Sequence, residues 1–151
     1  MKLEHINKGK YIPINASKYS GDITKITYRS EWERLTMRWL DLNPDVVTWN
    51  SEDIKIKYVC GTDGLLHTYH MDFIVKFKNG KVLMIEIKPK KQTVQPVPTK
   101  GKKKSTLLTE SLAWVKNQSK WKAAIQYAKD NKIEFQIWTE DTLRLLGIMV
   151  R

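Results

Sequence analysis

Two apolar stretches decide the fold: residues 69–75, Tyr-His-Met-Asp-Phe-Ile-Val, and residues 83–89, Leu-Met-Ile-Glu-Ile-Lys-Pro. Both are rich in strand-forming residues, and each carries ionisable residues within its apolar run. A charge in such a position is costly to bury unless it is paired or binds a metal. Asp72, Glu86 and Lys88 are therefore the first candidates for a functional site.

The segment between the two stretches sets their register. If residues 78–80, Lys-Asn-Gly, form a three-residue hairpin loop with glycine in the left-handed conformation, Phe77 pairs with Lys81. Asp72 then lies directly opposite Glu86, on the same face of the sheet. A two-residue turn would instead place these carboxylates on opposite faces, because side chains alternate along a strand.

Carboxylates on directly opposed residues lie about 5 Å apart and repel each other unless a cation lies between them. Oxygen ligands favour Mg²⁺ or Mn²⁺. We therefore expect Asp72 and Glu86 to hold such an ion, with the backbone carbonyl of Ile87 as a further ligand. The ion would contact a scissile phosphate. Lys88 shares the face of Glu86, where it would orient or help to deprotonate the attacking water, or balance charge on the phosphate.

The charge balance points to a polyanionic partner, because 27 Lys and Arg residues face 16 Asp and Glu, a net charge of +11. Nucleic acid is the first candidate, and a membrane surface is the weaker one because no basic amphipathic helix is visible. No apolar run is long enough to cross a bilayer, and residues 1–5 lack a secretory signal. The single cysteine, Cys60, is expected to be a buried strand thiol rather than a metal ligand.

Residues 88–105 contain seven lysines, three prolines and no acidic residue, which predicts a mobile basic loop. Such a loop is either a solvated segment or a DNA-contacting one, and the lack of acids favours DNA. For His70, a solvent-facing strand histidine is an equally good interpretation. The candidate DNA-binding residues are Arg29, Lys90, Lys91, Lys100, Lys102, Lys103 and Lys104, with His70 as a further candidate.

The remaining pattern predicts an α/β fold with one mixed central β-sheet flanked by helices. Residues 1–28 form an extended arm, with some aromatic and isoleucine residues packed down, and residues 29–151 form one domain. The first helix is expected at 30–42, with Ser30 and Glu33 as a capping box and Asp41 on its exposed face. Strands are expected at 46–50, 54–60, 65–77, 82–87 and 133–138, and helices at 109–131, broken near 117–119, and from Thr139 to about 146. Because a helix precedes the last strand, we expect that strand to pair in parallel.

These residues and this order of elements resemble the PD-(D/E)XK nuclease superfamily, whose fold is restriction-endonuclease-like: a helix, a three-strand meander, a helix and a strand. The motif stands here as Met71-Asp72 followed by residues 86–88, Glu-Ile-Lys, with methionine where the family usually has proline. The resemblance implies a Mg²⁺-dependent DNA endonuclease that cleaves phosphodiester bonds, with Asp72, Glu86 and Lys88 as its catalytic residues.

The first helix narrows the resemblance to the TnsA-like branch. Residues 29–34, Arg-Ser-Glu-Trp-Glu-Arg, resemble the first helix of that branch, in which the acid follows a Ser-x-x-Glu pattern. The resemblance therefore gives Glu33, rather than Glu31, the role of a further catalytic and metal-binding carboxylate. The capping role of Glu33 is a sufficient explanation from spacing alone.

The arm carries a narrower resemblance. Residues 8–15, Lys-Gly-Lys-Tyr-Ile-Pro-Ile-Asn, and the segment leading into residues 28–30 resemble the head-completion nucleases of contractile-tailed phages. This resemblance implies action on packaged DNA or its end at the filled capsid. It also implies capsid or portal-neck proteins as partners, and a location in the bacterial host cytoplasm or within the virion.

Two other functions compete with this one. The first is a non-catalytic DNA-binding capsid-neck protein on an inherited nuclease fold, and the intact set of Asp72, Glu86 and Lys88 speaks against it. The second is a resolvase or transposition nuclease subunit. The oligomeric state would help to separate it from a phage nuclease, and the sequence leaves that state open.

Overall fold

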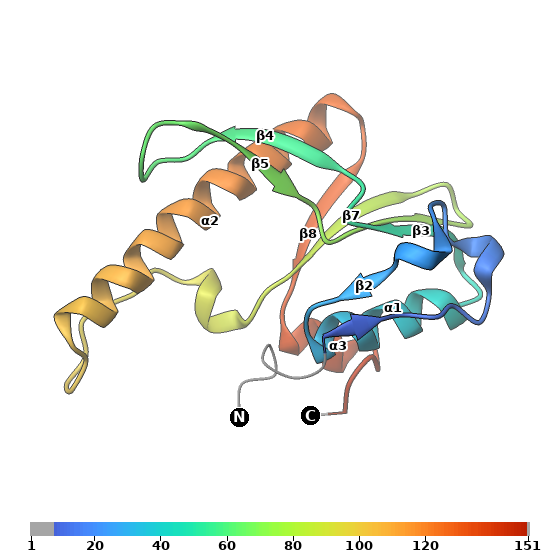
Figure 1. Cartoon of the computed structure of the whole chain (residues 1–151), viewed down its shortest axis with the longest axis horizontal. Helices are drawn as coiled ribbons and strands as arrows, with labels where there is room; N and C mark the ends of the chain where they lie inside the picture. Colours follow the sequence, from blue (N-terminus) through green and yellow to red (C-terminus); the bar gives the residue numbers. More distant parts are fainter. Residues whose placement is uncertain (1–7, 151) are drawn as a thin grey trace.

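The computed structural model describes residues 8–150, and a four-stranded sheet with the order β3-β6-β7-β8 lies at its centre (Figure 1). Its strands are β3 (Val46–Ser51), β6 (Phe73–Phe77), β7 (Val82–Ile87) and β8 (Glu134–Trp138). The first three pair antiparallel, whereas β8 pairs parallel to β7 after a crossover helix. The prediction of a mixed central sheet with a parallel last strand is therefore confirmed.

The single strand expected at 65–77 is wrong, because the chain breaks at Met71-Asp72 into β5 (Leu66–His70) and β6. β5 pairs with β4 (Lys55–Val59) in a separate two-stranded sheet, and β6 pairs with β3. The neighbouring segment, between β3 and β4, breaks at the same level, where Glu52 has a φ of 56° and its N–H donates to the Asp72 carbonyl. The two segments therefore bend together at Asp72. Alternation along one segment gave no sign of this bend, because the bend depends on both.

Helix α1 (Glu31–Leu42) begins at Ser30, whose hydroxyl accepts a hydrogen bond from the Glu33 N–H at 3.2 Å. In a capping box the Glu33 carboxylate would accept a hydrogen bond from the Ser30 N–H. Here it accepts one from the Arg29 N–H instead, at 3.3 Å, so this part of the prediction is wrong. Its side chain thus lies at the very start of the helix, beside the end of the central sheet.

Asp41 is fully buried, which corrects the prediction that it lies on the exposed face of α1. Its carboxylate accepts hydrogen bonds from the Tyr11 hydroxyl and the Ile14 N–H, each at 2.7 Å, and from the Asn15 N–H at 2.9 Å. The partners come from the N-terminal arm, so helical periodicity alone could not reveal them. The arm is thereby fastened along α1.

The arm contains a short ladder of β1 (Gly9–Lys10) with β2 (Thr27–Tyr28), and two 3-10 turns, η2 (Ala16–Lys18) and η3 (Ile23–Lys25). Its aromatic residues pack as expected, since Tyr11 and Tyr19 both contact Trp49 edge-on. Ile12 and Ile14 do not pack, being 84% and 67% exposed. Residues 1–7 of the predicted arm lie outside the described residues.

Helix α2 (Lys104–Asp130) runs without interruption, so the predicted break near residues 117–119 is wrong. It begins inside the segment expected to be irregular, which also contains the 3-10 turn η4 (Lys90–Thr93). The N-terminal half of α2 extends beyond the sheet, in the yellow-orange part of Figure 1. The last helix, α3 (Glu140–Leu145), begins after Thr139 as predicted.

The central sheet separates two cores. Arm residues, α1 and α3 cover one face, where Trp49, Phe73 and Leu143 are buried. The β4–β5 hairpin and α2 cover the other face around Tyr69, Met84 and Trp121. Among the described residues, no helix is long and apolar enough to span a membrane. The face toward α2 is the one to which Asp72 and Glu86 belong by strand alternation.

Candidate active site

The hairpin between β6 and β7 has the predicted three-residue loop. The N–H groups of Phe77 and Gly80 donate to the carbonyls of Lys81 and Phe77 respectively, each at 2.9 Å, and Gly80 has a φ of 87°. The ladder runs from Lys76–Val82 to Phe73–Ile85. One further step of this register places Asp72 opposite Glu86, as the loop predicted. The two acids of the motif thus come together where the hairpin is bent.

The surroundings of Asp72 disfavour two ionised carboxylates in the absence of a cation. Its Oδ2 accepts a hydrogen bond from the Ile87 N–H at 2.8 Å, which fixes the carboxylate against β7. Burial raises the pKa of Asp72 well above its usual range, and the charges of Glu86 and Glu33 raise it further. A divalent cation would remove this repulsion, so the donor set fits such an ion.

Lys88 lies beside Glu86, with its Nζ 3.6 Å from Glu86 Oε2. The Glu86 side chain is 5% exposed and that of Lys88 is 22% exposed, so the pair is largely shielded while the lysine keeps access to solvent. The Lys88 N–H donates to the Trp138 carbonyl at 3.0 Å, which fixes its backbone to β8. The spacing of two residues thus places acid and lysine on one face, as expected.

Glu33 reaches the same site from α1. Burial raises its pKa, as do the charges of Glu52 and Glu86, whereas the hydrogen bond from the Arg29 N–H lowers it. The charge of Glu86 acts on Glu33, and the charge of Glu33 acts on Asp72. Glu33, at the N-terminus of α1, is therefore a candidate for a third carboxylate beside this pair.

The predicted DNA-binding residues divide into two groups. Arg29, Lys90 and Lys102 form ion pairs with Glu52, Asp141 and Glu110, at 3.0, 3.0 and 2.8 Å. Residues 88–105 contain no acid, but acidic residues of α2 and α3 form ion pairs with two of the lysines in this segment. A count of charges within the segment alone misses these pairs. The candidates that stay exposed without an ion pair among residues 8–150 are Lys91, Lys100, Lys103, Lys104 and His70.

Two residues at the site were not found from the sequence. Lys120, on the inward side of α2, lies with its Nζ 5.3 Å from the centroid of the Tyr69 ring. Its electrostatic neighbours include Glu86, Lys88 and Asp72. Burial raises the pKa of Tyr69, and the charges of Glu86 and Asp72 raise it further. The spacing in the sequence could have indicated Lys120, because it lies four residues before Ala124, on the buried side of α2. The predicted helix break near residues 117–119 hid this helical spacing.

A second group of possible ligands lies at the turn of the β4–β5 hairpin, where atoms of Cys60, Asp63 and His67 lie within 4.8 Å of one another. Cys60 is buried, as predicted, but it lies one residue after β4 rather than within a strand. One cysteine gave no reason to expect neighbouring ligands. The three side chains already have partners, because Asp63 Oδ2 lies 2.8 Å from His67 Nε2 and Cys60 Sγ lies 3.0 Å from the Thr62 hydroxyl.

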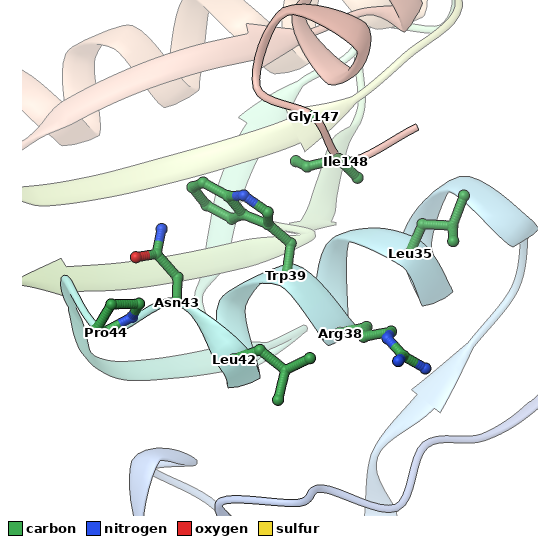
Figure 2. A pocket seen from close by; sticks show the side chains of 8 residues that line it. All are labelled: Leu35, Arg38, Trp39, Leu42, Asn43, Pro44, Gly147 and Ile148. Atoms are coloured by element: carbon green, nitrogen blue, oxygen red, sulfur yellow. The ribbon is translucent and has the colours of Figure 1, made fainter. Parts of the chain in front are cut away.

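Figure 2 shows a hollow between α1 and the segment after α3, on the opposite side of the sheet from the site. Leu35, Trp39 and Ile148 line it, and Arg38 is the one ionisable residue among its lining residues. It therefore lacks acid–base or metal-binding chemistry. A second hollow, between residues 91–102 and α2, is lined by residues that include Val97, Trp114 and Asn117.

Known proteins are similar to this chain over most of its length. The family model described as the TnsA-like endonuclease N-terminal domain matches residues 43–140, which include Asp72, Glu86 and Lys88 but not Glu33. The head completion nuclease of Enterobacteria phage T4 is 46% identical over 144 residues, covering 92% of this chain and 95% of that protein. No solved structure matches the chain significantly. The predicted resemblance to the TnsA-like branch is therefore confirmed.

Proposed function

Because the chain belongs to the TnsA-like endonuclease family, we propose that it is a Mg²⁺-dependent DNA endonuclease whose site is centred on Asp72, Glu86 and Lys88. The observation that carries this proposal is the β6–β7 register, which sets Asp72 across from Glu86 with Lys88 beside it. A family match alone would allow a decayed site. Here all three groups are present, Lys88 Nζ lies 3.6 Å from Glu86 Oε2, and one further step of the register sets Asp72 opposite Glu86.

Asp72 and Glu86 would hold the ion, with the backbone carbonyl of Ile87 as a further ligand. When bound, Mg²⁺ or Mn²⁺ supplies positive charge at the scissile phosphate and favours ionisation of water. The hydrogen bond from the Ile87 N–H to Asp72 supports this assignment, because it holds the carboxylate in place before any ion arrives. The raised pKa of Asp72 supports it as well, because burial and then the charges of Glu86 and Glu33 disfavour its ionised form, and a cation would favour it.

Lys88 would orient the attacking water and balance charge on the phosphate, because its ammonium group is partly exposed yet tied to Glu86. Glu33 would act as a third carboxylate, either as a ligand or as a proton acceptor from water. Its raised pKa makes it a better proton acceptor than an ordinary glutamate. DNA would reach the site along exposed basic residues, among them Lys91, Lys103 and Lys104.

The role in phage head completion is the finer part of the proposal. It rests on the similarity to the T4 head completion nuclease over nearly the whole of both chains. By this account the protein acts on packaged DNA or its end, meets capsid or portal-neck proteins, and is located in the host cytoplasm or in the virion. A non-catalytic DNA-binding protein at the capsid neck is the competing function.

Plasmid and linear DNA should be incubated with the protein and Mg²⁺ or Mn²⁺, beside an EDTA control and folded Asp72→Ala and Lys88→Ala variants. The proposal expects metal-dependent cutting by the wild type, and a loss of at least about a hundredfold in both variants. Salt-dependent DNA binding by all three proteins, without cutting by any, would instead support the capsid-neck binding protein.

A further inference from the structure

Lys120 is a cation for which residues 8–150 provide no ion pair. It lies on the inward side of α2, next to the buried residues Asn117 and Trp121, and its side chain is half-buried. Among residues 8–150 it makes no ion pair, and the contact that holds its ammonium group is the Tyr69 ring. Burying a charge in this way is costly, so a lysine placed here without an acid partner needs an explanation.

The charged groups around Lys120 suggest an explanation for its position. Lys120 lies on α2, the helix that covers the sheet face to which Asp72 and Glu86 belong, and the charges that act on it are those of Glu86, Lys88, Lys116 and Asp72. Burial lowers its pKa, and the proximity of Glu86 raises it. The site therefore has one cation, Lys88, directly after β7 and a second cation, Lys120, on α2.

The placement of Lys120 is set by backbone contacts. The Gly61 N–H donates to the Ser119 hydroxyl at 3.0 Å, which fastens the β4–β5 hairpin to the turn of α2 that carries Lys120. A side chain at Gly61 would meet Val115 at 2.9 Å, so glycine permits the close approach. Tyr69, which is 2% exposed, then lies beneath the ammonium group. A lysine held in this way can meet an incoming anion without large rearrangement.

We propose that Lys120 is a second phosphate-contacting cation of the active site, binding the phosphate of the DNA strand held over Asp72 and Glu86. This inference rests on the proposed nuclease function, in which α2 would contribute a phosphate-binding lysine. Lys88 would approach the phosphate from the end of β7, and Lys120 would approach it from α2. An unpaired lysine that only covered the Tyr69 ring would not need to face the two acids.

The test compares Lys120→Met, which keeps the aliphatic stem, with Lys120→Arg and with Lys122→Met as a matched control. Lys122 is exposed on the same helix. Single-turnover cleavage by Lys120→Met, measured with DNA saturated by protein, should fall by about a hundredfold relative to Lys122→Met, with recovery in Lys120→Arg. Cleavage by Lys120→Met at the rate of Lys122→Met under these conditions overturns the inference.

A second measurement separates this inference from the nuclease function. Amine modification of the wild-type protein, read by mass spectrometry with and without DNA in EDTA, needs no cleavage. DNA should protect Lys120 and leave Lys122 reactive. Equal reactivity of Lys120 with and without DNA overturns the phosphate contact. Protection combined with no cleavage under any metal condition would defeat the proposed function alone.

Discussion

Asp72 lies across the β6–β7 register from Glu86, and its Oδ2 accepts the Ile87 N–H at 2.8 Å. The fold therefore holds two carboxylates face to face at the bend of a hairpin. Without a cation this arrangement is unfavourable, because burial and the charges of Glu86 and Glu33 raise the pKa of Asp72. The residues that would bind an ion are thus residues that weaken the metal-free protein.

Replacing Asp72 by asparagine should stabilise the metal-free protein while abolishing cleavage. The folded-state pKa of Asp72 is raised above its ordinary value of 3.8, so the fold binds this proton more tightly than the unfolded chain does. Its contribution to stability is full below the ordinary value and is lost as the pH rises through the folded-state pKa. In EDTA at neutral pH, thermal unfolding of Asp72→Asn should occur a few degrees above that of the wild type.

The pH dependence supplies the control for that prediction. The difference between the two proteins should shrink as the pH falls toward the ordinary pKa, because Asp72 then becomes protonated in both states. A lower melting temperature for Asp72→Asn at neutral pH in EDTA would contradict the raised pKa.

Glu33→Gln should slow single-turnover cleavage by about tenfold to a hundredfold and leave α1 intact. The amide can still accept the hydrogen bond from the Arg29 N–H, so the helix start should persist. The matched control is Ser30→Ala, which removes the acceptor for the Glu33 N–H and should cost about 1 kcal/mol of stability. Equal rates for Glu33→Gln and the wild type would leave Glu33 as a helix-capping residue.

The exposed lysines should determine how DNA binding depends on salt. Replacing Lys91, Lys103 and Lys104 by alanine should reduce the slope of log Kd against log salt by about 2.7, if each neutralises one phosphate. The double variant Lys90→Ala/Lys102→Ala should change that slope less, because these lysines already pair with Asp141 and Glu110. A larger effect from the ion-paired lysines would show that DNA breaks those pairs and binds there.

Asp41→Asn should destabilise the protein by about 3 kcal/mol or more. The carboxylate accepts three hydrogen bonds from the arm, and an amide can replace them only in part. Urea unfolding measures the loss. Asp45→Asn, an exposed position just after α1, serves as the control. A loss no greater than that of the control would mean that the arm does not depend on Asp41.

The sequence predicted the elements that local rules determine. The glycine of the loop at 78–80 and strand alternation predicted the opposition of Asp72 and Glu86, because both are properties of one hairpin. The Ser30 cap predicted the start of α1. Each of these features depends on residues close together in the chain.

What could not be predicted depends on contacts between distant segments. Asp41 looked exposed because its partners, Tyr11 and Asn15, come from the arm. The break at Met71-Asp72 requires the neighbouring segment of the chain to turn at Glu52. Lys120 enters the site only because α2 is continuous and packs on the β4–β5 hairpin. In each case tertiary packing overrides a local pattern.

The central claim is that Asp72 and Glu86 together form one divalent-ion site. It is tested most directly by titrating Mn²⁺ into the DNA-bound protein and measuring the free ion by electron paramagnetic resonance. The account predicts saturable binding by the wild type and by Lys88→Met, weakened by at least about tenfold in Asp72→Asn and in Glu86→Gln. Equal Mn²⁺ affinity in all four proteins would contradict it.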